Sequence, residues 1–157
     1  MAKYGIGQAV TRREDERLLF GKGQFLDDIS IEGETFMCFV RSPHARARIL
    51  SIEVDEAEKM EGVIDVILGS HMLSDGVSPL PVNAALKRAD GSPMSAAPNY
   101  PLAVETTEYV GKAVAAVIAS TREGAQNAAE AILVEYEDLP AVVTVEGAMA
   151  QGAPQLW

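Results

Sequence analysis

Cysteine and histidine are scarce in this sequence, which holds one cysteine and two histidines among its 157 residues. The single cysteine, Cys38, excludes an intrachain disulfide framework and any zinc or iron–sulfur site that needs several cysteines. The histidines, His44 and His71, leave little material for a histidine metal site. Long hydrophobic runs are also missing, because the longest, residues 113–119, is far shorter than the ~20 residues of a membrane helix.

The overall composition is that of one soluble domain. Apolar residues make up 48% of the chain and charged residues 23%, which excludes wholesale disorder. The net charge of −10 argues against binding to nucleic-acid phosphates or to an anionic membrane. The first residues show no basic region followed by an apolar run, so no targeting segment is indicated. We therefore predict a cytoplasmic protein without nucleic-acid or membrane partners.

Charge is unevenly distributed along the chain. Residues 1–50 hold eight Lys/Arg and seven Asp/Glu, a net of +1, whereas residues 51–157 hold five and sixteen, a net of −11. A nearly neutral N-terminal segment thus precedes an acidic body. Such a segment is able to fold back on that body or to dock on a partner.

Apolar periodicity, capping residues and Gly/Pro punctuation predict an α+β order of elements. Residues 35–41 are apolar on both faces and indicate a buried strand. Gly111-Lys112 separates two apolar runs at hairpin spacing, and Ser120 to Glu123 forms a capping box before an amphipathic helix. The predicted elements are an irregular arm over 4–34, strands over 35–41, 46–54, 63–68, 107–110, 113–119 and 134–137, helices over 56–60, 121–133 and 144–150, a helical turn from 69, and a long loop over 75–101.

No catalytic template is satisfied by these residues. The glycine pairs near positions 5 and 21 lack the remainder of a dinucleotide or phosphate-binding loop. Ser42 and His44 are two residues apart without a nucleophile elbow, and Cys38 falls in the most apolar strand, where cysteine is usually inert. We accordingly expect no catalytic, cofactor-binding or metal-binding residue in this chain.

Three segments resemble the large subunits of the molybdenum hydroxylases, the family of xanthine dehydrogenase, aldehyde oxidase and carbon monoxide dehydrogenase. Residues 5–29 resemble the opening of those subunits, and residues 42–49 resemble the next block, with Arg46 where histidine is common. The third stretch comprises residues 109–115, 128–130 and 134–143. In it, Lys112-Ala113 replaces the usual acidic residue and proline.

The resemblance implies the α/β hammerhead domain that begins these subunits: a mixed sheet or partial barrel with a few short helices and an irregular arm. Three parts are expected on this basis. They are an arm over residues 1–34, packing on or beyond the domain, the hammerhead domain over 35–150, and the start of a linker to a missing catalytic region over 151–157.

The resemblance also implies the chemistry of a parent enzyme, which hydroxylates an aldehyde, an N-heterocycle or carbon monoxide. Its molybdenum–pterin cofactor lies in the catalytic region of the same subunit, with iron–sulfur clusters and FAD in partner subunits or domains. No catalytic residue of the family has a matching position here. The isolated chain is therefore expected to be inactive, and its role to be scaffold and interface.

The arm supplies most of the residues expected at such an interface. Its mixed charges suit polar docking, and its aromatic residues suit apolar anchoring. The candidate interface residues are Arg13, Asp15, Arg17, Phe25, Asp28 and His44. Three alternatives stay open at this point: an arm that packs only on its own domain, a free-standing small-molecule-binding module with the same fold, and an enzyme that uses His44 or Cys38.

Overall fold

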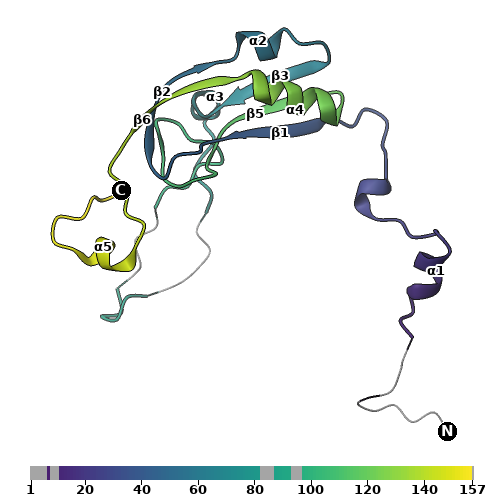
Figure 1. The fold of residues 1–157 in the computed structure, drawn as a ribbon, viewed down its shortest axis with the longest axis horizontal. Coiled ribbons are helices and arrows are strands. Elements are labelled where there is room, and N and C mark those ends of the chain that lie inside the picture. Colours follow the sequence, from purple (N-terminus) through teal and green to yellow (C-terminus); the bar gives the residue numbers. More distant parts are fainter. Residues whose placement is uncertain (1–6, 8–10, 82–86, 93–96, 157) are drawn as a thin grey trace. The chain divides into compact units, whose positions relative to one another are not determined.

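The computed structural model describes residue 7 and residues 11–81, 87–92 and 97–156. The chain divides into two compact units, Met1–Glu34 and Thr35–Trp157. Each unit is described by itself below, with the element labels of Figure 1.

The described residues of the first unit are irregular apart from two single turns. Helix α1 spans Asp15–Leu19, and the 3-10 turn η1 spans Leu26–Asp28. Helix α1 ends where Gly21 adopts a φ of 66°, a left-handed conformation that glycine reaches without strain. The amide of Gly21 donates to the carbonyl of Leu18, which closes the turn. An irregular arm is thus confirmed, although its charged run forms a short helix that the sequence pattern does not predict.

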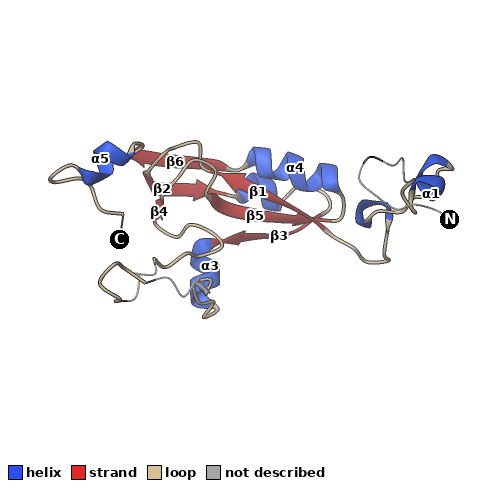
Figure 2. Cartoon of the chain, turned by 90° about the horizontal axis from the view of Figure 1, so that it is seen from below, coloured by secondary structure: helices blue, strands red, loops and turns tan. Residues whose placement is uncertain are grey.

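The second unit contains two three-stranded sheets, both antiparallel (Figures 1 and 2). Sheet A has the order β1-β5-β3, with β1 at Phe36–Arg41, β3 at Val63–Leu68 and β5 at Ala113–Ala119. Sheet B has the order β4-β2-β6, with β2 at Ala47–Glu53, β4 at Thr106–Thr107 and β6 at Leu133–Asp138. The predicted α+β class is confirmed, and the mixed sheet or partial barrel takes the form of these two sheets.

The predicted hairpin around Gly111-Lys112 is wrong. Strand β4 pairs with β2 in sheet B, whereas β5 pairs with β1 and β3 in sheet A. The turn between them instead carries the chain from one sheet to the other. Gly111 has a φ of 93° there, and the Lys112 amide donates to the carbonyl of Tyr109. Tertiary pairing overrides the local hairpin signal because β5 is apolar on both sides and becomes the central strand of its sheet.

The described part of the second unit also contains four short helices: α2 at Asp55–Glu58, α3 at Gly69–Ser74, α4 at Arg122–Ala131 and α5 at Val145–Met149. The N-cap of α4 is Thr121 and not Ser120, because Thr121 has the extended backbone of a cap and its Oγ1 accepts from the Gly124 amide at 3.0 Å. Asp55 lies inside α2, one residue before the predicted start of that helix, and provides no side-chain cap. No helix among the described residues is long and apolar enough to cross a membrane.

The main core lies between sheet A and helices α2 and α4. Figure 1 shows α4 over β1 and β5, and α2 and α4 contact each other. Ala128 and Ala129 of α4 are buried with Ala115, Val117 and other small apolar residues, so the helix approaches the sheet closely. Each fully buried valine contributes about 1.5–3 kcal/mol relative to exposure.

Strand β1 is covered on one face only, which corrects the prediction of a strand buried on both. Cys38 and Val40 pack against the main core, whereas Met37 and Phe39 on the other face are 54% and 41% exposed. A smaller core on this outer face of sheet A joins Leu102, Ala113 and Ala116 with Ile67 and Met72. Its cover comes from α3 and the segment around Leu102, which leave the β1 side open.

Candidate functional site

Five of the candidate interface residues lie in the first unit. Arg13, Arg17, Phe25 and Asp28 are exposed, and Asp15 at the start of α1 is half-buried. The structure brings together only one pair of these residues by a hydrogen bond: the backbone amide of Phe25 donates to Asp28 Oδ2 at 2.9 Å. That bond fixes the η1 turn and presents the Phe25 ring, which is 66% exposed, to solvent.

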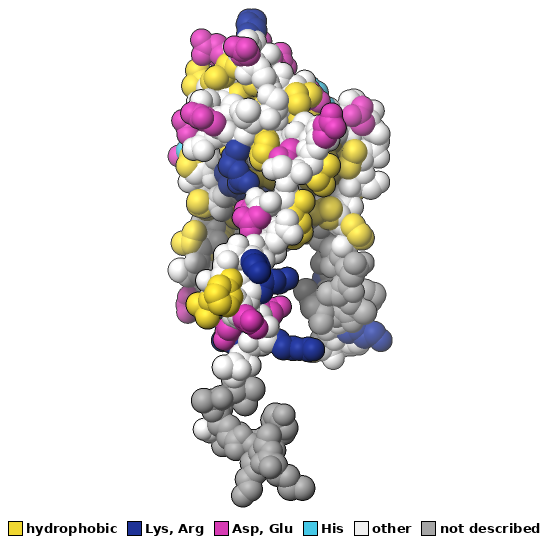
Figure 3. Space-filling model, turned by 90° about the vertical axis from the view of Figure 1, so that its right-hand side faces the viewer, with side chains coloured by type: hydrophobic (Ala, Val, Ile, Leu, Met, Phe, Trp, Pro, Cys, Tyr) yellow, Lys and Arg dark blue, Asp and Glu magenta, His cyan; other side chains and the backbone are white. Residues whose placement is uncertain are grey.

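Large apolar side chains are exposed throughout the first unit. Leu19 and Leu26 are more than four-fifths exposed, and Phe20 is nearly three-quarters exposed. Exposed aromatic and aliphatic side chains beside charges are the composition of an interface anchor. The second unit also has apolar side chains at its surface, and Figure 3 shows such side chains between charged ones.

The sixth candidate, His44, belongs to the second unit and lies in the connection between β1 and β2. Its Nδ1 is 2.7 Å from Asp138 Oδ1, at the end of β6, and its ring lies 4.6 Å from the ring of Tyr136. The imidazole therefore ties the β1–β2 connection to the neighbouring strand. The contact is structural, and its carboxylate partner, Asp138, is exposed.

Ser42 is unsuited to act as a nucleophile for His44. Its side chain is buried, its Oγ is 3.2 Å from Thr107 Oγ1, and it accepts the backbone amide of His44. Tyr136 also hydrogen-bonds Ser42. Burial raises the pKa of the Tyr136 phenol from its ordinary value of 10.0, and the bond with Ser42 acts in the opposite direction.

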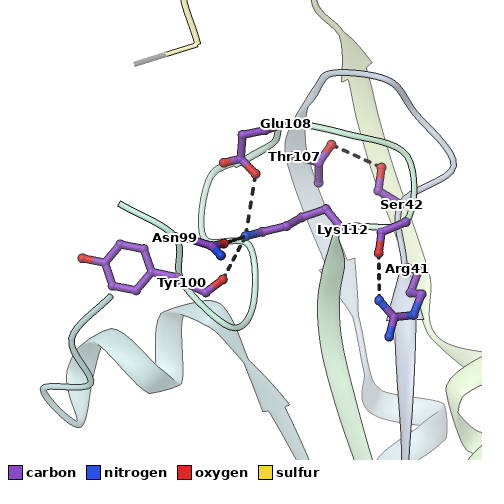
Figure 4. A network of polar contacts seen from close by, with 8 residues as sticks. Arg41, Ser42, Asn99, Tyr100, Thr107, Glu108 and Lys112 are labelled. Carbon is purple, nitrogen blue, oxygen red and sulfur yellow. Dashed lines mark hydrogen bonds and ion pairs between the residues drawn. The ribbon is translucent and has the colours of Figure 1, made fainter. Parts of the chain in front are cut away.

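Lys112 is the most buried charged side chain of the described residues, with 4% exposure. Its Nζ donates to Asn99 Oδ1 at 3.0 Å and to the Tyr100 carbonyl at 2.8 Å, and it lies 3.8 Å from Glu108 Oε2 (Figure 4). A buried ammonium is tolerated because these oxygens replace its water. The only sequence signal for this residue is its departure from the family pattern.

The turn at Gly111 and Lys112 is also held by Arg41 and Ser42. Arg41 Nη1 donates to the Gly111 carbonyl at 2.9 Å, the Gly111 amide donates to the Ser42 carbonyl, and the Ser42 amide donates to the Lys112 carbonyl. The bonds through Lys112 and its neighbours thus fasten together the end of β1, the turn before β5 and the residues around Tyr100.

Arg46 anchors the C-terminal segment of the second unit. Its guanidinium donates to the Pro140 carbonyl at 3.1 Å and to the Gln155 carbonyl at 2.9 Å. An open cavity of about 470 Å³ lies beside it, lined mostly by small apolar side chains such as Ala45, Val142 and Ala148. Because the guanidinium already bonds two carbonyls, its hydrogen-bonding capacity toward a ligand is reduced.

The residues present do not fit an iron–sulfur cluster, since such clusters are held by several cysteines and the sequence has one, Cys38. That cysteine is half-buried and packs against the main core. Within the described ranges, no group of three or more His, Cys, Asp or Glu side chains is placed to hold a metal ion. The polar groups described above instead join strands and turns to one another.

The fold and these contacts define a small α+β domain whose internal polar networks are structural. The family model for the aldehyde oxidase and xanthine dehydrogenase a/b hammerhead domain matches residues 20–140. The chain belongs to that family. The resemblance inferred from residues 5–29, 42–49 and the third stretch is thereby confirmed.

Two relatives illustrate the relationship. The chain is 40% identical over 148 residues to the gamma subunit of the 6-hydroxypseudooxynicotine dehydrogenase complex of Paenarthrobacter nicotinovorans, covering 92% of this chain and 18% of that subunit. It is 35% identical over 152 residues to the carbon monoxide dehydrogenase large chain of Afipia carboxidovorans, covering 97% and 17%. The chain therefore spans less than a fifth of the length of these relatives.

Solved structures give the same result. Quinoline 2-oxidoreductase from Pseudomonas putida 86 matches with a TM-score of 0.76 and 40% identity, over 94% of this chain and 18% of that one. The Cu,Mo-CO dehydrogenase in its carbon monoxide reduced state matches with a TM-score of 0.76 and 34% identity, over 96% and 18%. The fold described above is thus a recurrent part of much larger oxidoreductase chains.

Replacing Lys112 with methionine tests the buried ammonium. K112M keeps the apolar stem but leaves Asn99, the Tyr100 carbonyl and Glu108 without their donor, so the free energy of unfolding should fall by about 1–3 kcal/mol. Urea denaturation measures the loss, and amide exchange should be faster at Asn99 and Tyr100. The control K59M removes a lysine that is 77% exposed, and should change stability by less than about 0.5 kcal/mol. Equal effects of the two substitutions would contradict the assignment.

The raised pKa of Tyr136 predicts a loss of stability in alkali. Above pH 10 the unfolded chain releases the phenolic proton before the folded chain does, so the free energy of unfolding falls as pH rises through that range. Below the ordinary value of 10.0 this contribution is fully present. In urea titrations at increasing pH, Y136F should show a shallower decline than the parent. Identical slopes for the parent and Y136F would refute the shift.

Proposed function

We propose that this chain is the scaffold and interface domain of a molybdenum-containing hydroxylase large subunit and is not catalytic by itself. The observation that carries the proposal is the asymmetry of coverage. The matches include nearly all of this chain but only 17–18% of the relatives, whose names are those of oxidoreductases. The domain would hold the catalytic region and the partner subunits in register, since electron relays tolerate little displacement.

The implied cofactors follow from the same proposal. A molybdenum–pterin centre would belong to the catalytic region of the large subunit, with iron–sulfur clusters and FAD in flavin and iron–sulfur partners. When bound, that centre supplies oxidative hydroxylation with water as the oxygen source. The substrate class would be an aldehyde, an N-heterocycle or carbon monoxide. This chain would contribute contacts to the assembly, in the cytoplasm.

A chimera tests this function. The matching 148 residues of the Paenarthrobacter nicotinovorans gamma subunit, which are 40% identical, are replaced by this chain. The chimera should co-purify with the other subunits of that complex and carry molybdenum, measured by gel filtration and elemental analysis. The isolated chain should carry no stoichiometric molybdenum and turn over no substrate. Stoichiometric molybdenum in the isolated chain, or a folded chimera that recruits no subunit, would count against the proposal.

We further propose that the arm, residues 1–34, docks beyond its own domain. Support comes from its exposed apolar side chains, among them Leu19, Phe20, Phe25 and Leu26. In this view Arg13, Asp15, Arg17 and Asp28 surround those anchors with charge. His44 would belong to the same kind of interface on the second unit.

Deleting residues 1–30 distinguishes the two roles of the arm. If the arm serves a partner, the thermal midpoint of the isolated chain should change little on deletion, while the chimera should lose its assembly. Differential scanning calorimetry and gel filtration give the two readouts. A large fall in the midpoint of the isolated chain would show instead that the arm stabilises its own domain.

A second candidate function is a free-standing small-molecule-binding module with this fold. One observation favours it, the cavity of about 470 Å³ beside Arg46. That volume falls within the range of ligand pockets. The open wall of the cavity and the occupied guanidinium of Arg46 make it the weaker candidate, and titration calorimetry with aldehydes and N-heterocycles would reveal binding heat if it is correct.

A further inference from the structure

The outer face of sheet A, away from α2 and α4, consists of two cross-strand rows of side chains. In the first row Phe39 of β1 pairs with Ala116 of β5, which pairs with Ile67 of β3. In the second row Met37 and Asp65 lie on either side of Ile118. Ala116 lies between these two large side chains and is itself buried, in the smaller core that contains Leu102.

An open groove of about 360 Å³ lies on this face, with Phe39, Ile67 and Ala116 in its lining. Its walls come from α3 and its following turn, through Met72, Asp75 and Val77, and from the segment at Pro101 and Leu102. Methionine side chains at two places on the wall are able to adapt to the shape of a partner. Met37 and Phe39 are each more than two-fifths exposed, so the described residues of the second unit leave this apolar surface uncovered.

The groove is held in position by the polar contacts described above. The Arg41 guanidinium lies 5.3 Å from the centre of the Phe39 ring and donates to the Gly111 carbonyl, which fixes it beside the ring. Strand β1 is an edge strand, paired only with β5 among the described strands. A partner would meet a surface bordered by the unpaired edge of β1.

The described charges around the groove are two carboxylates and the Arg41 guanidinium, which lies beside the Phe39 ring and is bonded to the Gly111 carbonyl. Asp75 lines it, and Asp65 stands in the second row on the same face. The Asp65 carboxylate accepts a hydrogen bond from the amide of Val66, and no cation of the described residues forms an ion pair with Asp75. A second copy of this acidic body would oppose carboxylates to carboxylates, whereas a segment with Lys or Arg would be attracted.

From these observations we infer that the outer face of sheet A is the docking surface for the remainder of a hydroxylase large subunit. The docking segment would present apolar side chains to Met37, Phe39 and Ile67, and a Lys or Arg to Asp75. The inference rests on the proposed function and adds the surface and the chemistry of its partner. Chain length supports this occupant, because the matched relatives carry more than four-fifths of their length outside the region shared with this chain.

Methionine oxidation in the chimera described above tests whether this face is covered. Dilute hydrogen peroxide should oxidise Met37 at least ~10-fold more slowly in the assembled chimera than in the isolated chain, as read by peptide mass spectrometry. Because tenfold corresponds to 1.4 kcal/mol, a specific contact easily produces such protection. Met37 oxidation at equal rates in the two samples would overturn the inference, even if the chimera assembles and the proposed function stands.

Paired substitutions test the chemistry of the surface. M37K/D75K places two cations on the groove at exposed positions, and should reduce the yield of assembled chimera at least ~10-fold. The matched control L50K/E53K changes one exposed hydrophobic residue and one carboxylate on sheet B, and should assemble as the parent does. Thermal midpoints of the isolated variants show that both fold. If M37K/D75K is unfolded, the single substitution D75K replaces it.

Three further outcomes would overturn the docking surface, its occupant or the proposed function. Assembly of M37K/D75K at the parent level would overturn the docking surface. An isolated parent chain that sediments as a dimer, and becomes a monomer with M37K/D75K, would assign the groove to a second copy and overturn the chosen occupant. Failure of the unsubstituted folded chimera to recruit any subunit would remove the proposed function, and this inference with it.

Discussion

The second unit depends on the burial of one strand, β5, between two neighbours and two apolar layers. All of its residues except Ile118 are buried, and alanine at positions 115, 116 and 119 keeps its side chains short. Small side chains let α4 approach on one face, where Ala128 and Ala129 match them. On the other face Ala116 lines the open groove together with Phe39 and Ile67. The close packing and the open groove therefore both involve small side chains of β5.

The polar contacts around Lys112 make that arrangement possible. Strand β5 must begin where the chain leaves sheet B, so the turn at Tyr109 to Lys112 carries unpaired backbone groups that need partners. Arg41 and Ser42 meet backbone groups of this turn, and the Lys112 ammonium binds the segment near Tyr100. The two sheets are thus joined by hydrogen bonds at a buried corner, and the apolar layers are left free to pack or to receive a partner.

Much of the fold could be predicted from local patterns, and the failures have a common reason. The strand at Val63–Leu68 agrees with the structure in its bounds, and the amphipathic helix and the α5 turn agree closely, because each has its own periodicity and flanking signals. The predicted hairpin between β4 and β5 was wrong because β5 pairs with β1 and β3 and not with the short β4. The prediction that β1 is buried on both faces was wrong because local hydrophobicity does not show which face other elements cover. Among the candidate interface residues, Phe25 and Asp28 are three positions apart in the sequence. That spacing alone does not predict that the Phe25 amide donates a hydrogen bond to Asp28.

By itself the sequence determined the family, the α+β class, the acidic character of the body and the absence of a multi-cysteine site. These properties follow from residue identity and spacing, which need no knowledge of distant contacts. Only the tertiary structure decided that Lys112 is buried among three oxygen partners, that His44 meets Asp138, and that Met37 and Phe39 lie uncovered beside Asp75. Each of these facts joins residues that are far apart in the chain or depends on which faces remain open, and packing of the whole domain sets both.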